Sequence, residues 1–386
     1  MKEKVSNLLF ITIITLIPTI FIWLPFFLRL ESVWGIPLPK DGMATVVANY
    51  DGPLFIATAK SLYNPEILNT FEFNLPVEYF AAHFPLYPIL IRLLSGIAGY
   101  PYAMLIITLL SSFLAIFYFS KLIGDYVSKK DIGWMTAVFA LFPARWLIVR
   151  SVGSPEPLFL ATIIASLYYF RKEKYLLAGI WGLFAQLTKS PGILLFLAYL
   201  MYFLLPKMKL AALSGTFKKW MQTINFKHLL SILLIPLGLL AIFVFYKLQL
   251  NDFFAYFHSG DNIHLFFPPF QIFNYSQPWV GTFWLEEVIF IYLFGVLGLI
   301  KLIKMKENQL AWFVGIFFTS ILFVSHRDLM RYSLPIVPFL LIAFSDTITK
   351  KEFKIAMLVL IIPIYLFSLV YISQNVMPIS DWAPIL

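Results

Sequence analysis

The chain has 386 residues, of which 60% are hydrophobic and 13% charged, and it contains no cysteine. Soluble domains carry about a quarter charged residues, so this composition excludes an ordinary soluble domain, and the lack of cysteine excludes disulfides and thiol chemistry. The net charge of +9 does not indicate a nucleic-acid partner, because the basic residues are dispersed and do not alternate with aromatic residues on a soluble face.

Long apolar runs separated by short polar breaks predict an all-α transmembrane bundle of about 11 spans, forming one integral membrane domain over residues 1–386. Runs such as Leu8 to Leu28 are continuous and lack the alternation of β-barrel strands. Lysines precede the first run and no small-residue cleavage site follows it, so we expect a retained anchor. The expected spans are 8–30, 101–123, 132–150, 155–170, 174–190, 191–206, 229–246, 286–303, 309–324, 333–345 and 355–373.

Loop charge predicts the orientation of these spans. With a cytoplasmic N-terminus, most of the 29 basic residues fall in loops on one side, and nearly all of those are lysines. Positive loops stay in the cytoplasm, so the opposite face, with most of the acids and arginines, is extracytoplasmic. We expect the active site there, at the cell membrane of a prokaryote or in the ER of a eukaryote. The basic loop 207–228 is expected to lie on the inner leaflet.

The first extracytoplasmic loop, residues 31–100, contains the most informative polar residue. Asp51 stands in Asn49-Tyr50-Asp51-Gly52-Pro53, ahead of an expected amphipathic helix over 54–63, and a second helix is expected over 84–94. A carboxylate beside aromatic residues can act as a base on a sugar hydroxyl. The alternative is an N-cap or turn residue, because Asp-Gly-Pro is also good turn chemistry. His83 is a candidate for binding sugar or acceptor, or else a structural histidine.

Basic residues of the next spans are candidates for binding a phosphate. Arg145, Arg150 and Lys189 lie near the outer face, and guanidinium groups suit forked phosphate recognition. The alternative is that they extend to lipid headgroups. Glu156, at the mouth of a span, is expected either to orient the sugar or to pair with Arg150.

The second extracytoplasmic loop, residues 247–285, is rich in aromatic residues, which suits the headgroup zone. It contains His258, Asp261 and His264, whose spacing fits no strong metal motif. We therefore expect no metal and no other cofactor.

A late outer turn completes the set of candidate residues. Arg327 and Arg331 are four residues apart and would share a helix face. With His326 they would form a cationic patch for the donor phosphate, unless the arginines only reach lipid headgroups. Tyr50 and His326 are also candidates for sugar or acceptor contacts.

Two motifs of the first loop resemble a known family. The stretch Asn49-Tyr50-Asp51-Gly52, followed by His83-Phe84-Pro85-Leu86-Tyr87-Pro88, resembles the first outer loop of PIG-V-type mannosyltransferases. These are polytopic glycosyltransferases of the GT-C class that use a polyprenyl-phosphate-linked sugar. Tyr50 replaces the usual tryptophan, and His83 departs from the family pattern by preceding Phe84.

Two later segments are similar to the same family. Ser154-Pro155-Glu156-Pro157-Leu158-Phe159-Leu160 is similar to its Ser-Glu-x-Leu-Phe element, and Leu187-Thr188-Lys189-Ser190-Pro191-Gly192 is similar to its Thr-Arg-x-x-Gly turn. Lysine stands in this turn where arginine is commoner. The resemblance covers residues 45–200, and beyond it Arg331-Tyr332-Ser333-Leu334-Pro335 is suggestive.

The resemblance implies an inverting glycosyltransferase with Asp51 as its base. It would move a hexose, with mannose favoured, from a polyprenyl-phosphate donor to a glycolipid or glycan acceptor. The implied partners are membrane lipids, this donor and the acceptor, and a partner subunit stays open. The alternatives are a lipid-linked-sugar flippase or transporter and a non-catalytic subunit of a glycosyltransferase complex. Transporters place ionisable groups near the bilayer midplane, whereas the charges of this chain gather at the outer interface, which favours an enzyme.

Overall fold

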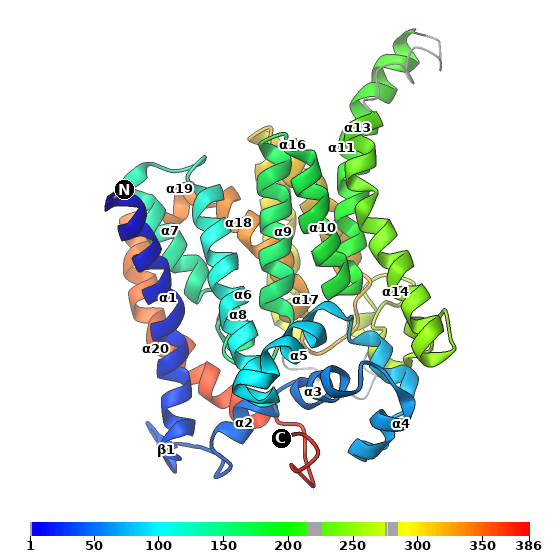
Figure 1. The fold of residues 1–386 in the computed structure, drawn as a ribbon. Coiled ribbons are helices and arrows are strands. Elements are labelled where there is room, and N and C mark those ends of the chain that lie inside the picture. Colours follow the sequence, from blue (N-terminus) through cyan, green and yellow to red (C-terminus); the bar gives the residue numbers. More distant parts are fainter. Residues whose placement is uncertain (1, 215–225, 275, 277–284) are drawn as a thin grey trace. The chain divides into compact units, whose positions relative to one another are not determined.

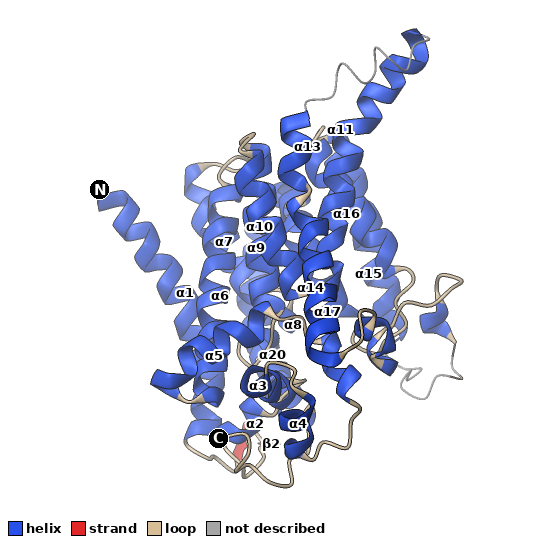
Figure 2. Ribbon diagram, turned by 45° about the vertical axis from the view of Figure 1, so that its right-hand side comes forward, coloured by secondary structure: helices blue, strands red, loops and turns tan. Residues whose placement is uncertain are grey.

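The computed structural model describes residues 2–214, 226–274, 276 and 285–386. The described chain is almost entirely helical, and the hairpin β1–β2 (Ser32–Val33 and Ile36–Pro37) is the one sheet in it (Figures 1 and 2). Contacts between elements divide the chain into two compact units, and each is described by itself.

The first unit comprises Met1–Ala161, Ile242–Asn262 and Ser345–Leu386. Besides the hairpin, its elements are α1 (Lys2–Phe27), α2 (Met43–Val47), α3 (Gly52–Ser61), α4 (Pro65–Leu68), η1 (Asn69–Phe71), η2 (Val77–Ala82), α5 (Leu86–Ala98), α6 (Tyr100–Ile123), α7 (Lys129–Leu141), α8 (Ala144–Val149), the start of α9 (Glu156–Arg171), the end of α14 (Leu234–Leu250), η4 (Ala255–His258), η5 (Gly260–Asn262), α19 (Ser345–Ile348) and α20 (Lys351–Gln374).

The second unit comprises Thr162–Ala241 and Ile263–Phe344. Besides the remaining parts of α9 and α14, its elements are α10 (Tyr175–Thr188), η3 (Ser190–Gly192), α11 (Ile193–Ser214), α13 (Phe226–Ile232), η6 (Gln271–Phe273), α15 (Leu285–Lys304), α16 (Asn308–Ile321), α17 (Leu329–Ser333), η7 (Leu334–Ile336) and α18 (Val337–Ala343).

A helix occupies each of the expected spans. Among the described residues, four helices are long and apolar enough to cross a membrane by length and composition: Ser6–Phe27, Tyr100–Ile123, Lys227–Leu250 and Lys351–Gln374. Several other apolar helices have only 10–17 residues, so the count of about 11 spans stays a prediction. The expected inner-leaflet segment falls largely on residues 215–225, which lie outside the described residues.

The span expected over 132–150 is interrupted in the middle. Helix α7 ends at Leu141 and α8 begins at Ala144. Pro143 lacks the N–H that would continue the helix and disfavours helical backbone at the residue before it. Phe142 is accordingly extended, with φ −128° and ψ 138°.

The first outer loop folds into the core of the first unit. Both expected helices are present, as α3 and α5, but α3 is not a surface helix, because all its residues except Lys60 are buried. Its sequence has too few polar residues for a solvated face, and a helix that is apolar on all sides is buried. Arg92 of α5 donates hydrogen bonds to the carbonyls of Ala59 and Lys60, at 3.0 and 2.7 Å, and so satisfies the C-terminal end of α3.

The beginning of the second outer loop packs on the first loop within the same unit. Elements η4 and η5 contact η2. Tyr246 donates a 2.8 Å hydrogen bond to the carbonyl of Ala81, and the Asn262 side chain donates one of 3.3 Å to the carbonyl of Tyr79. Residues 275 and 277–284 of this loop, with several of its aromatic residues, lie outside the described residues.

Candidate active site

Asp51 lies at the junction of α2 and α3. The N–H of Gly52 closes the turn onto the carbonyl of Asn49 at 3.1 Å, and Tyr50 adopts a positive φ of 50° to make this turn. Pro53 occupies the first turn of α3, where its missing N–H costs nothing. The turn therefore places the carboxyl group of Asp51 directly ahead of a buried helix.

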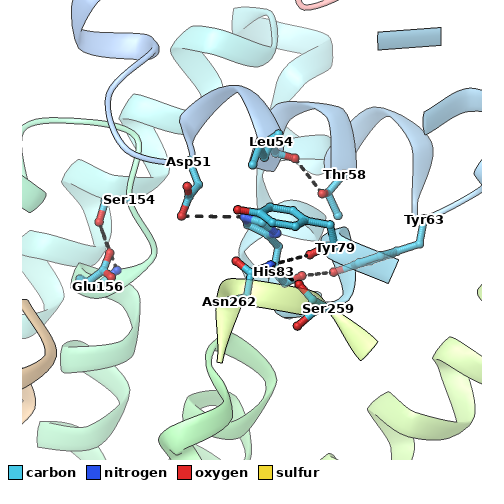
Figure 3. Close-up of polar contacts among 10 residues, drawn as sticks. All are labelled: Asp51, Leu54, Thr58, Tyr63, Tyr79, His83, Ser154, Glu156, Ser259 and Asn262. Atoms are coloured by element: carbon cyan, nitrogen blue, oxygen red, sulfur yellow. Dashed lines mark hydrogen bonds and ion pairs between the residues drawn. The ribbon is translucent and has the colours of Figure 1, made fainter. Parts of the chain in front are cut away.

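The Asp51 side chain does not cap that helix. It accepts no hydrogen bond from the N–H groups of α3, although its residue is in the N-cap position. Its Oδ2 lies 3.9 Å from Nε2 of His83, and the side chain of Asp51 is 44% exposed whereas that of His83 is 4% exposed (Figure 3). Asp51 therefore does not act as the helix cap that was the alternative prediction, and its carboxylate is accessible.

Gly52 has no room for a side chain, so this turn requires glycine at position 52. A Cβ at this position would clash with the carbonyl oxygen of Val47 and would meet the Cε of Met104 at 3.3 Å. Glycine is therefore needed here for close backbone approach, although its φ is not positive.

If Asp51 is the expected base, Gly52→Ala should displace it and lower turnover by roughly 10²-fold, because a shift of about 1 Å in a reacting group has this effect. The measurement is the rate of the expected sugar transfer by the purified variant, with Gly96→Ala as control. A Cβ at Gly96 meets no atom within 4 Å, so this change should leave the rate unaltered. Equal rates for the two variants would contradict a required turn geometry.

Tyr50 connects the Asp51 turn with the C-terminal helix of the same unit. Its ring lies 5.8 Å from that of Tyr371 in α20, and the guanidinium carbon of Arg145 lies 3.6 Å from the centre of the Tyr371 ring. Such a distance is that of a cation–π contact. The Tyr371 ring thus links this cation to Tyr50, the residue next to Asp51, and Arg145 remains a candidate for phosphate.

Two asparagines fasten the same helix end to the Asp51 turn. The Asn49 side chain donates to the carbonyl of Ile372 at 2.7 Å and accepts from the Asn375 side chain at 3.3 Å. The N–H of Tyr50 also donates to the carbonyl of Asn375, at 3.3 Å. These contacts join segments more than 300 residues apart. Neither Asn375 nor Tyr371 was predicted from the sequence to belong to the site.

Arg150 is fully buried and serves the backbone. Its guanidinium donates to the carbonyl oxygens of Ala140 and Ile14 at 2.9 and 3.2 Å, to that of Thr15, and to the hydroxyl of Thr19. Carbonyls inside a helical bundle have no water to bind, so a forked donor there stabilises the packing of α1 on its neighbours. These hydrogen bonds give Arg150 a structural role in place of the expected phosphate contact.

Glu156 is buried in the turn that begins α9. The hydroxyl of Ser154 donates to its carboxylate (Figure 3). The backbone carbonyl of Ser154 accepts a 3.3 Å hydrogen bond from the hydroxyl of Thr108 in α6. Arg150 donates its hydrogen bonds to backbone carbonyls and to Thr19. The expected ion pair between Arg150 and Glu156 is therefore not formed. A role of Glu156 in orienting sugar stays a prediction.

The second unit carries a separate cationic group around His326. The ring of His264 lies 4.4 Å and that of Tyr332 lies 5.3 Å from the ring of His326. The Nε of Arg331 lies 3.6 Å from Oδ2 of the buried Asp328. His264, which the sequence analysis considered only as an unconvincing metal ligand, is thus a member of this group.

Hydrogen bonding fixes the chemistry of the His326 ring. The N–H of Asp328 donates to Nδ1 of His326 at 2.9 Å, so the neutral ring carries its hydrogen on Nε2. Burial, and then the charges of Arg331, His264 and Arg327, lower the pKa of His326 to about 2. The ring is therefore a neutral donor in positive surroundings, which would suit an anion.

Arg327 is placed differently from the expectation. Helix α17 begins at Leu329, so Arg327 precedes it, is exposed and does not share a helix face with Arg331. Because Arg327 lies in the loop before α17, the helical i,i+4 spacing does not apply to Arg327 and Arg331. Lys189 ends α10 in extended conformation and is half-buried. Phosphate binding by either residue stays a prediction.

Among the described residues, no three His, Cys, Asp or Glu side chains form a group that could hold a metal ion.

The fold of the chain is similar to that of a solved structure. It is similar to the crystal structure of ArnT from Cupriavidus metallidurans bound to undecaprenyl phosphate, with a TM-score of 0.56 and 11% sequence identity. The match covers 89% of this chain and 62% of the ArnT chain, so this chain spans less than two thirds of the ArnT length. At this identity the likeness concerns the fold. No family model and no curated protein matches the sequence.

The apolar helices and this fold together make the chain an integral membrane protein. The orientation of its termini and the finer family assignment, to the PIG-V type, remain predictions from the sequence.

Proposed function

We propose that this chain is an inverting glycosyltransferase that takes a hexose from a polyprenyl-phosphate-linked donor and attaches it to a glycolipid or glycan at the extracytoplasmic face. The observation that carries the proposal is the Asp51 carboxylate, which is 44% exposed in a GT-C-type fold and not used as a helix cap. The undecaprenyl phosphate bound by ArnT supports a polyprenyl phosphate as the lipid part of the donor.

The proposed reaction is a single displacement. Asp51 takes the proton of an acceptor hydroxyl while that oxygen bonds to the anomeric carbon of the sugar. The bond between this carbon and the phosphate oxygen breaks, and polyprenyl phosphate leaves with the electron pair. Because attack and departure occur on opposite faces, the configuration at the anomeric carbon inverts.

The leaving phosphate gains negative charge and needs cationic donors. Arg331, with the Nε2–H group of His326 nearby, is our first candidate for this role in the second unit, and Arg145 is the candidate in the first unit. Fixed donors aimed at developing charge stabilise a transition state more than the ground state. The PIG-V resemblance makes mannose the first sugar to test.

The test is transfer of radiolabelled sugar in membranes that contain the full chain, from polyprenyl-phosphate donors carrying mannose, glucose, galactose or arabinofuranose, with and without chelator. We expect one donor to be used and its product to have the inverted anomeric configuration. Sugar that crosses the membrane without being transferred would indicate a flippase or transporter. A correctly folded chain that turns over only with an added protein would indicate a subunit of a complex.

A further inference from the structure

The candidate base has a buried neighbour. His83 was a candidate for binding sugar or acceptor, or else a structural histidine, and its side chain is 4% exposed. Figure 3 shows the contact of its ring with Asp51, and the ring centroids of His83 and Tyr79 lie 6.2 Å apart.

The histidine is held firmly in this position. The edge contact between its ring and Phe55 of α3 has a centroid distance of 4.7 Å and an interplanar angle of 82°. The backbone N–H of His83 donates to the carbonyl of Phe80 at 3.0 Å, and the backbone carbonyl of His83 accepts a hydrogen bond from the Tyr63 hydroxyl. Packing and hydrogen bonds on several sides fix a side chain well enough for it to orient a reactive group.

The second outer loop reinforces this position through η2. The Asn262 side chain bonds the carbonyl of Tyr79 at 3.3 Å, and Tyr246 bonds the carbonyl of Ala81 at 2.8 Å, so η2 is fastened on both sides just before His83. The position of His83 therefore depends on Tyr246 of α14 and Asn262 of the second outer loop, both far from it in the sequence.

The chemistry of the pair fixes which atom carries hydrogen. An ionised carboxylate only accepts hydrogen bonds, so the ring nitrogen that faces it must donate. Nε2 is the facing atom, 3.9 Å from Oδ2 of Asp51. Hydrogen bonds among catalytic groups are often long before the substrate binds and shorten in the reactive complex.

The geometry points to His83 as a positioning residue whose Nε2–H group holds Oδ2 of Asp51, so that Oδ1 is presented to the acceptor hydroxyl. This inference rests on the proposed function, because it takes Asp51 as the base. The acceptor proton moves to Oδ1 while His83 keeps its own proton, so His83 orients the base and does not itself transfer a proton.

Two amide variants test the inference. In His83→Gln the amide nitrogen lies about as far from the backbone as Nε2, whereas in His83→Asn it reaches only about as far as Nδ1. We expect His83→Gln to keep kcat within a few-fold of wild type. His83→Asn should lower kcat by about 10- to 100-fold with an unchanged KM for the donor, since orientation and not binding is lost. Thermal unfolding is measured for each variant.

His258→Asn is the matched control. His258 is exposed on η4, and its Nδ1 is 2.6 Å from Oδ2 of Asp252, so it also pairs with a carboxylate but lies outside the proposed site. Its replacement should leave kcat unchanged.

The outcomes separate this inference from the proposed function. The inference is overturned if His83→Asn turns over like wild type, or if His83→Gln is slow or does not fold, while Asp51→Asn abolishes transfer. If His83→Asn does not fold, the rate of His83→Gln alone decides. A wild-type chain that transfers no sugar from any donor overturns the proposed function, and this inference falls with it.

Discussion

Replacing Asp51 with asparagine should lower turnover by roughly 10²- to 10⁴-fold, the usual contribution of a general base. Asparagine keeps the shape of the side chain and most of its hydrogen bonding, but it cannot accept the proton of the acceptor hydroxyl. Donor affinity should change little, because the donor phosphate is held by other residues. The measurement is the rate of sugar transfer at saturating donor, together with donor binding.

The asparagine variant also separates catalysis from capping. Asparagine is nearly as good an N-cap as aspartate, so a structural Asp51 predicts normal turnover in this variant. Asp41→Asn is the matched control, because Asp41 is an exposed carboxylate of the same loop. Wild-type rates in both variants would remove Asp51 from the mechanism.

Apolar periodicity made the helices predictable. Continuous hydrophobic runs have one stable solution inside a bilayer, because a helix satisfies its own backbone groups. A helix was accordingly found in every expected span, and both expected helices of the first outer loop exist as α3 and α5. The break between α7 and α8 was also readable in principle, since Pro143 is visible in the sequence.

The environment of these helices was less predictable than their existence. Helix α3 was expected to be amphipathic, yet it is almost fully buried, because α5 and α6 of the same unit pack on it. Whether an apolar stretch faces lipid or protein depends on which later elements of the chain pack against it.

Long-range contacts account for the missed residues. Tyr371 and Asn375, at the end of the last helix, contact the Asp51 turn. No local sequence pattern predicts a contact between segments so far apart in the chain. The same limit applies to the arginines. Arg145 and Arg150 are five residues apart in one expected span, but Arg145 stacks on Tyr371 whereas Arg150 binds backbone carbonyls of α1. Their difference lies in what surrounds each side chain.

Arg331 is the candidate for which charge and geometry can be separated. Its side chain is 15% exposed, and its Nε lies 3.6 Å from Oδ2 of Asp328. Its guanidinium carbon lies 5.5 Å from the centre of the Tyr332 ring. These contacts orient the guanidinium, whereas an arginine that only extends to lipid headgroups would need no such orientation.

Replacing Arg331 with lysine should lower both kcat and donor affinity, by about 10- to 100-fold in kcat/KM, because lysine keeps the charge but loses the forked donors that strengthen as charge develops on the leaving phosphate. Arg331→Ala should be slower still. The matched control is Arg171→Lys, since Arg171 is 17% exposed and also pairs with a carboxylate, that of Glu307. If Arg331→Lys turns over normally at saturating donor, Arg331 only anchors the loop, and the phosphate role passes to Lys189 or Arg145.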